Sequence, residues 1–141
     1  MNILISACLL GQYCRYDGKT KVYPQVQDLL GRDDIHLIPV CPEQAGGLAT
    51  PRPAAERQGS RVVTANGSEV TAQYQRGAEA ALYWARLFHC TKAILKEKSP
   101  SCGHGQIYDG TFSRILTAGD GVTAALLRAE GLEIIGESDL P

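Results

Sequence analysis

Residues 1–9 read MNILISACL, a short and almost wholly apolar run that decides the fold. Apolar runs of this length are typical of strands buried in a parallel sheet. Similar runs recur at residues 35–40 (IHLIPV), 92–96 (KAILK) and 132–136 (LEIIG). The sequence therefore predicts a mainly parallel sheet built from these segments.

Helical patterns separate the predicted strands. Residues 72–90 give the clearest pattern. Its apolar stripe at helical spacing consists of Tyr74, Ala78, Ala81, Leu82, Ala85 and Phe88. Shorter helices are expected at residues 24–32 and 121–130. Strands that alternate with helices predict an α/β fold with helices flanking the sheet, and the 141 residues fit one domain over residues 1–141.

Turn signals mark the remaining segments. Asn66-Gly67, between residues 61–64 and 68–71, predicts a β-hairpin because Asn-Gly suits the tight turn of a hairpin. Residues 107–115 are expected to form a second hairpin or an irregular segment. Residues 42–53 are rich in glycine and proline and predict a loop.

Composition and charge argue against two classes of partner. The net charge is −1 and the basic residues are not clustered, so neither an extended nucleic-acid surface nor a membrane surface is expected. No run approaches the roughly 20 apolar residues that cross a bilayer. Ile5-Ser6-Ala7-Cys8 resembles a lipoprotein cleavage box, but the basic and hydrophobic parts of a secretory signal do not precede it. We therefore expect a cytoplasmic protein with a small-molecule ligand.

The positions of the cysteines carry most of the chemical information. Five occur, in a chain long enough to fold without disulfides: Cys8, Cys14, Cys41, Cys90 and Cys102. Cys8 ends the first apolar run, Cys41 follows the second, and Cys102 lies just beyond the third. Parallel strands end along one edge of a sheet, so these thiols can meet there. Converging thiolates suit zinc or an iron–sulfur cluster, and burial as small apolar side chains is an equally weighted alternative.

Motifs around these cysteines add a resemblance that covers essentially the whole chain. In order they are Ser6-Ala7-Cys8-Leu9-Leu10-Gly11, Arg15-Tyr16-Asp17-Gly18, Cys41-Pro42-Glu43, Gly46-Gly47-Leu48, Thr50-Pro51-Arg52, Leu95-Lys96, Ser99-Pro100-Ser101-Cys102-Gly103 and Tyr108-Asp109-Gly110-Thr111-Phe112. The series resembles a family of small bacterial proteins, long known only as a domain of unknown function, whose members are associated with thiouracil desulfidase activity.

The resemblance implies a single Rossmann-like domain that holds a [4Fe–4S] cluster on three cysteines. Carried onto this chain, the ligands are Cys8, Cys41 and Cys102. The implied reaction removes sulfur from a thiolated base, 2-thiouracil or 4-thiouracil, to give uracil and sulfide. Three ligands leave one of the four irons open, and that iron would bind the substrate sulfur.

The resemblance also implies catalytic parts for two other residues. Glu43 would move protons to the thiolated ring or activate water, and its alternative role is to cap a helix or pair with an arginine. Ser101 would hydrogen-bond the substrate or a cluster sulfur, and its alternative role is a turn hydroxyl that bonds local backbone.

Several residues near the motifs are expected to lie outside the ligand set. Cys14 could be a fourth ligand that closes the open iron, but we expect it to lie near the site without being a ligand, and we expect Cys90 to pack in the core. His104 could complete a zinc site with three cysteines, but an exposed loop histidine is favoured. Three cations are expected to be solvated: Arg15, Arg52 and Lys96.

Two other functions compete with the desulfidase interpretation. One is a non-catalytic zinc or iron–sulfur protein with a structural or sensory role. The other is desulfurisation of thiolated bases in transfer RNA. The near-neutral charge argues against long polynucleotide contacts, because these draw on many lysines and arginines.

Overall fold

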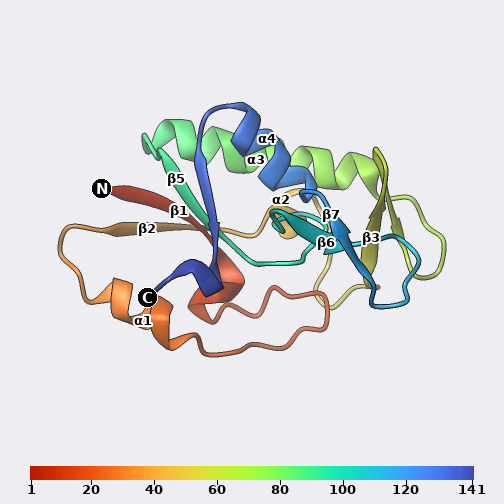
Figure 1. Ribbon diagram of the computed structural model, residues 1–141, viewed down its shortest axis with the longest axis horizontal. Coiled ribbons are helices and arrows are strands. Elements are labelled where there is room, and N and C mark those ends of the chain that lie inside the picture. The colour runs from red at the N-terminus through yellow and green to blue at the C-terminus, as the bar shows by residue number, and fades with distance from the viewer.

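A single parallel sheet organises the chain, as a computed structural model of residues 1–141 shows (Figure 1). Its strands are β1 (Asn2–Ser6), β2 (His36–Val40), β5 (Lys92–Leu95) and β8 (Glu133–Gly136), in the order β2-β1-β5-β8. All three neighbouring pairs are parallel. The predicted α/β class with a parallel sheet is confirmed.

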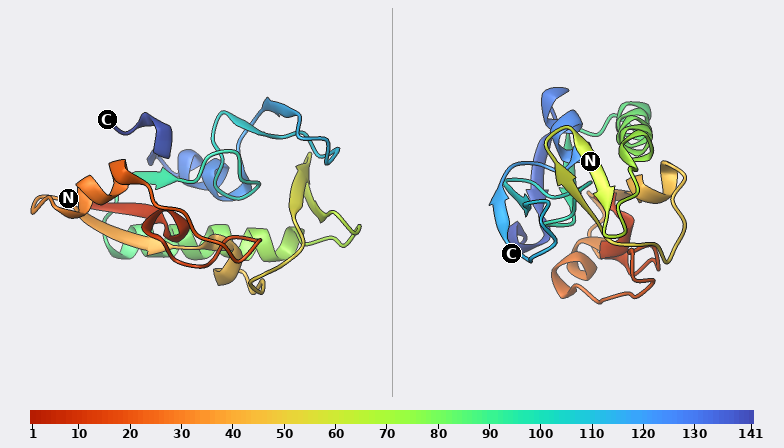
Figure 2. Two further views of the ribbon diagram at one scale, coloured as in Figure 1. Left: turned by 90° about the horizontal axis from the view of Figure 1, so that it is seen from below. Right: turned by 90° about the vertical axis from the view of Figure 1, so that its right-hand side faces the viewer.

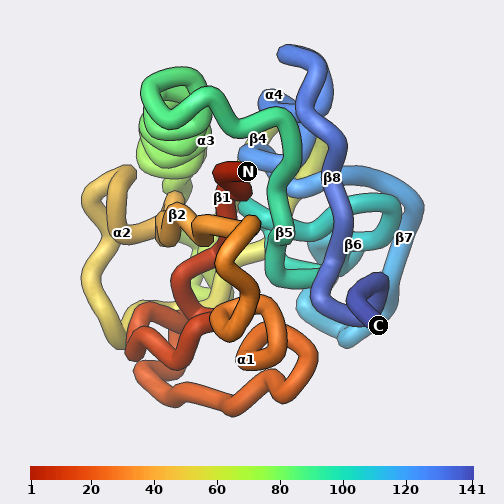
Figure 3. The backbone as a smooth tube through the Cα atoms, turned by 90° about the vertical axis from the view of Figure 1, so that its left-hand side faces the viewer, coloured from red at the N-terminus to blue at the C-terminus, as the bar shows by residue number.

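Helices cover both faces of this sheet. The long helix α3 (Thr71–Leu87) packs beside α4 (Val122–Ala129) on one face, and α1 (Pro24–Leu30) lies on the other (Figure 3). All three helices fall where the sequence predicts them. No helix is both long enough and apolar enough to cross a membrane.

Successive strand residues point to opposite faces, and both faces are buried. Leu4 and Leu95 belong to the apolar cluster completed by α3 and α4. Ile5 and Ile94 belong to a second cluster, which Val26 of α1 completes. The central strands β1 and β5 are buried on both sides almost throughout, and such strands need apolar residues at nearly every position, which is why their sequences show no polar alternation.

The first predicted hairpin forms in part, and β4 (Arg61–Thr64) has a longer second partner in β3 (Ala55–Gln58), the segment before it. The predicted partner, residues 68–71, is joined to β4 by an antiparallel bridge between Val63 and Glu69. The amide of Thr64 donates to the Ser68 carbonyl at 2.8 Å, and the amide of Val70 donates to the Val62 carbonyl at 2.9 Å. The sequence Ala-Glu-Arg-Gln of β3 has no strand pattern, and the end of the predicted partner is already the first turn of α3.

The second hairpin forms where it is expected. β6 (Gln106–Tyr108) pairs with β7 (Leu116–Ala118), and the wide loop between them is fastened to β3. The amides of Gly110 and Phe112 donate to Glu56 Oε1 at 3.0 and 3.2 Å. Both hairpins therefore stand together at one end of the molecule, beyond the carboxyl ends of the strands (Figure 2).

A short helix, α2 (Pro42–Ala45), replaces part of the predicted glycine- and proline-rich loop. It crosses α3 at backbone contact. A Cβ at Gly46 would collide with the backbone carbonyl of Gln73, and a Cβ at Gly77 would collide with that of Pro42. Only glycine permits this approach, so the two glycines fix the position of α2 against α3.

Gly77→Ala is expected to lower the free energy of unfolding, although alanine is the better helix former. The added methyl group meets the carbonyl of Pro42. Overpacking of this kind costs about 1–3 kcal/mol, which outweighs the roughly 1 kcal/mol gained in helix propensity. Urea unfolding measures the change, and the exposed Glu79→Ala on the same helix should alter stability by less than about 0.5 kcal/mol. Undiminished stability of Gly77→Ala would contradict the backbone contact.

Candidate cluster-binding site

Three cysteines meet at the carboxyl edge of the sheet. Cys8 lies in the 3-10 turn Ala7–Leu10 that continues β1, Cys41 joins β2 to α2, and Cys102 lies in the turn after β5. All three line one cavity of about 420 Å³. The structure thus brings together the thiols that the strand pattern predicts to meet; they are called the three cavity cysteines below.

Cys14 also lines this cavity and is buried. Hydrogen bonding with the Cys14 side chain lowers the pKa of Cys41 to about 7, and it also lowers the pKa of Cys8. The same hydrogen bonds raise the pKa of Cys14. In the structure, Cys41 Sγ donates to the backbone carbonyl of Cys14 at 3.8 Å. Because the thiolate is the form that binds metals, the lowered pKa values suit Cys8 and Cys41 to ligation.

The third cavity cysteine is the most deeply buried. Burial raises the pKa of the Cys102 thiol, and a metal bound there would favour its thiolate. Its backbone is held by Ser99, whose Oγ accepts the amides of Ser101 and Cys102 at 3.1 Å each. The turn that carries Cys102 is therefore fixed independently of any ligand.

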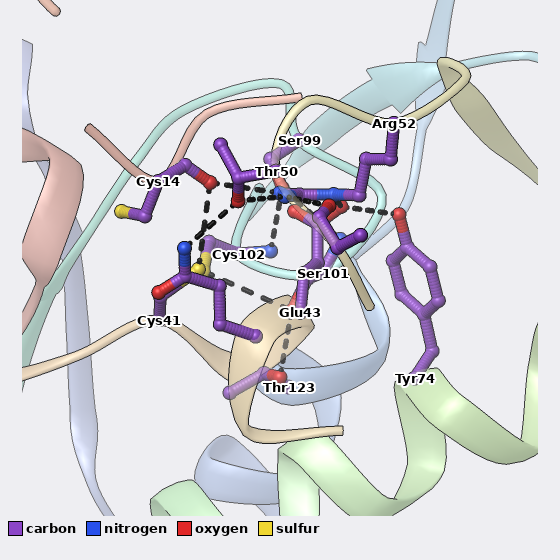
Figure 4. A network of polar contacts seen from close by, with 12 residues as sticks. Cys14, Cys41, Glu43, Thr50, Arg52, Tyr74, Ser99, Ser101, Cys102 and Thr123 are labelled. Carbon is purple, nitrogen blue, oxygen red and sulfur yellow. Dashed lines mark hydrogen bonds and ion pairs between the residues drawn. The ribbon is translucent and has the colours of Figure 1, made fainter. Parts of the chain in front are cut away.

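Ser101 stands behind Cys102 rather than on the cavity wall. Its side chain is fully buried, and its Oγ lies 2.8 Å from Oγ1 of Thr123 at the start of α4 (Figure 4). The Cys102 Sγ lies 3.9 Å from the same hydroxyl. The predicted contacts were to the substrate or to a cluster sulfur, whereas the hydroxyl lies against the sulfur of Cys102 itself and does not line the cavity.

Glu43 projects from α2 onto the cavity wall. Its Oε1 accepts hydrogen bonds from the Tyr74 hydroxyl at 2.5 Å and from Arg52 Nε at 3.3 Å (Figure 4). Pairing with an arginine is the alternative role that the sequence suggests for Glu43. The structure shows this pairing, and it also places Glu43 on the cavity wall.

Four residues of this site are not predicted from the sequence. The expectation that Arg15, Arg52 and Lys96 are solvated is wrong, because all three line the cavity. Arg15 pairs with Asp17 at 3.2 Å, and Lys96 Nζ pairs with Glu137 Oε2 at 2.7 Å. Tyr74 was assigned only to helix packing. Arg52 and Lys96 belong to the motifs quoted above, and this position in the sequence could have indicated that they lie at the site. The helical stripe contains no feature that distinguishes Tyr74 from a packing residue.

The remaining candidates lie away from the cavity. His104 Nε2 pairs with Asp139 Oδ2 at 3.4 Å, and Cys90 packs in the core beside α3. No group of three or more histidine, cysteine, aspartate or glutamate side chains converges closely enough to hold a single metal ion. The arrangement therefore does not support the zinc site of three cysteines and a histidine.

The fold and the site define an α/β protein in which four free thiols, those of the three cavity cysteines and Cys14, line one cavity at the carboxyl edge of a parallel sheet. The family model for 2-thiouracil desulfurase matches residues 3–139. The chain belongs to the 2-thiouracil desulfurase family, as the motif resemblance predicts.

Two relatives agree with this placement. The uncharacterized protein YbbK of Bacillus subtilis (strain 168) is 42% identical over 148 aligned positions, which cover 98% of this chain and 97% of that protein. A solved structure of the [4Fe-4S]-dependent thiouracil desulfidase TudS is 50% identical. It superimposes with a TM-score of 0.93 over 99% of this chain and 93% of the other.

Ser101→Ala and Thr123→Val are each expected to destabilise the protein by about 1–3 kcal/mol, because each leaves the other buried hydroxyl without its partner. The double variant leaves neither hydroxyl unpaired, so its loss should be smaller than the sum of the single losses. Urea unfolding of the metal-free protein measures all three. Strictly additive losses would show that the two hydroxyls do not interact.

Proposed function

We propose that this protein is an iron–sulfur-dependent desulfidase of thiolated pyrimidines, which converts 2-thiouracil or 4-thiouracil to uracil and sulfide. One observation carries the proposal: the three cavity cysteines and the Glu43 carboxylate share one cavity. Membership of the 2-thiouracil desulfurase family and the likeness to TudS support it. The cavity volume of about 420 Å³ is in the range that suits a small molecule.

The residues present fit a [4Fe–4S] cluster held by the three cavity cysteines. Their thiols come from three strand ends, and none forms a disulfide. They stand too far apart for one ion. Each thiolate of a cluster binds a different iron, so cluster ligands need not converge on a single point. We therefore assign Cys8, Cys41 and Cys102 as the ligands.

When bound, such a cluster supplies a Lewis acid, because three protein ligands leave one iron open to the substrate sulfur. The chain's own residues move the protons. Glu43 takes a proton from the water that attacks the carbon bearing sulfur, and returns it to the departing sulfur. Ser101 supports the Cys102 sulfur from behind. Sulfur leaves as hydrosulfide, and the new hydroxyl loses its second proton as the carbonyl of uracil forms. The net exchange of water for hydrogen sulfide needs no electrons.

Anaerobic reconstitution with iron and sulfide tests the proposal. We expect about four irons per chain, a broad visible charge-transfer band, and release of uracil and sulfide from 2-thiouracil. The same assay with 4-thiouracil ranks the two substrates. Stoichiometric zinc with no uptake of iron would overturn the proposal in favour of a structural metal site.

Replacing any one of the three cavity cysteines by serine should remove the visible band, the iron and the activity together. Cys14→Ser is the matched control, because Cys14 lines the same cavity but stands outside the assigned ligand set. It should keep about four irons per chain. Iron analysis and the visible spectrum check both outcomes. A Cys8→Ser variant that keeps the full iron content and activity would refute the ligand assignment. Loss of the cluster in the single variant Cys14→Ser would refute it as well.

A further inference from the structure

Tyr74 carries a hydroxyl that packing does not explain. The residue lies one turn into α3, is 2% exposed, and packs with Val62 and Val70 in a small apolar cluster. A phenylalanine would fill that space equally well. A buried phenol needs a hydrogen-bond partner, and the partner of Tyr74 is Glu43 Oε1. The hydroxyl thus reaches out of the apolar cluster to a carboxylate on the cavity wall.

Arg52 approaches the same carboxylate oxygen from another direction. Its side chain is 6% exposed, and each of its nitrogens is engaged. Nε donates to Glu43, Nη2 donates to the carbonyl of Cys14 at 2.9 Å, and Nη1 donates to Ala49 and Thr50. A guanidinium bonded on all sides has little freedom to move, so it offers Glu43 a fixed partner.

The two donors leave the Glu43 carboxylate asymmetric. Both bind Oε1, and no protein group donates to Oε2. No fully buried side-chain oxygen or nitrogen lacks a partner, so the free Oε2 is accessible. Glu43 lines the cavity, and the accessible oxygen is therefore the one available to water and substrate.

We propose that Tyr74 is a positioning residue for the desulfuration, which together with Arg52 holds Glu43 so that Oε2 serves the reaction; this rests on the proposed function. In the step that it supports, Oε2 takes a proton from the attacking water, the carbon–oxygen bond forms, and the carbon–sulfur bond breaks. Oε2 then gives the proton to the departing sulfur, which leaves as hydrosulfide, and the new hydroxyl releases its remaining proton to solvent as the carbonyl of uracil forms. Oε1 stays bonded to Tyr74 and Arg52 throughout, so the carboxylate does not rotate between the two transfers.

The test is a double-mutant cycle of Tyr74→Phe and Glu43→Ala, with kcat, KM and iron content measured on the reconstituted enzyme. Tyr74→Phe should keep the iron and leave KM within about twofold, while kcat falls about 10- to 100-fold, the size expected for a misplaced catalytic group. In the Glu43→Ala background it should lower kcat no further. Tyr83→Phe, on an exposed tyrosine of the same helix, should change nothing.

Urea unfolding of the metal-free chain gives a second cycle that does not depend on activity. Tyr74→Phe should lower the unfolding midpoint when Glu43 is present, and should not lower it in the Glu43→Ala background. Unchanged kcat in Tyr74→Phe, or an equal loss with and without Glu43, would overturn the positioning role. An inactive wild-type enzyme would instead refute the proposed function, while the unfolding cycle still reports on the contact.

Discussion

The register of the parallel strands is the constraint on which the site depends. Ser6 at the end of β1 lies opposite Val40 at the end of β2, and Leu4 lies opposite Ala93 of β5. These strands therefore end at one edge, and the short segments after them bring the three cavity cysteines together. A slip by one residue would exchange the side chains of the two buried faces, so packing on both sides protects the register and, with it, the site.

Charge balance is the second requirement of this site. Thiolates in a partly buried cavity are costly unless cations or hydrogen-bond donors face them. Arg52 and Lys96 stand on the wall, and their charges contribute to lowering the pKa of Cys41 and of Cys8, respectively, after the larger effect of Cys14. Each cation is itself bonded to a carboxylate, Arg52 to Glu43 and Lys96 to Glu137. The cavity thus receives positive charge from groups whose positions are fixed.

The sequence predicts the sheet and the gathering of the cysteines because both depend on local patterns. An apolar run predicts a strand, and a cysteine at the carboxyl end of that strand is therefore expected at the edge of the sheet. β3 is not predicted from the sequence because the strand is polar and its pairing depends on tertiary context. Tyr74 was missed because its helical spacing indicates packing alone, and its contact with Glu43 joins elements far apart in the chain.

The most direct test of the account is the Mössbauer spectrum of protein reconstituted with isotopically enriched iron, recorded before and after addition of 2-thiouracil. We expect a four-iron cluster in which the signal of one iron changes on addition of 2-thiouracil, because three thiolates hold the other irons. A cluster in which no iron responds to the substrate, or a spectrum without a four-iron cluster, would contradict the claim that three cysteines present an open iron.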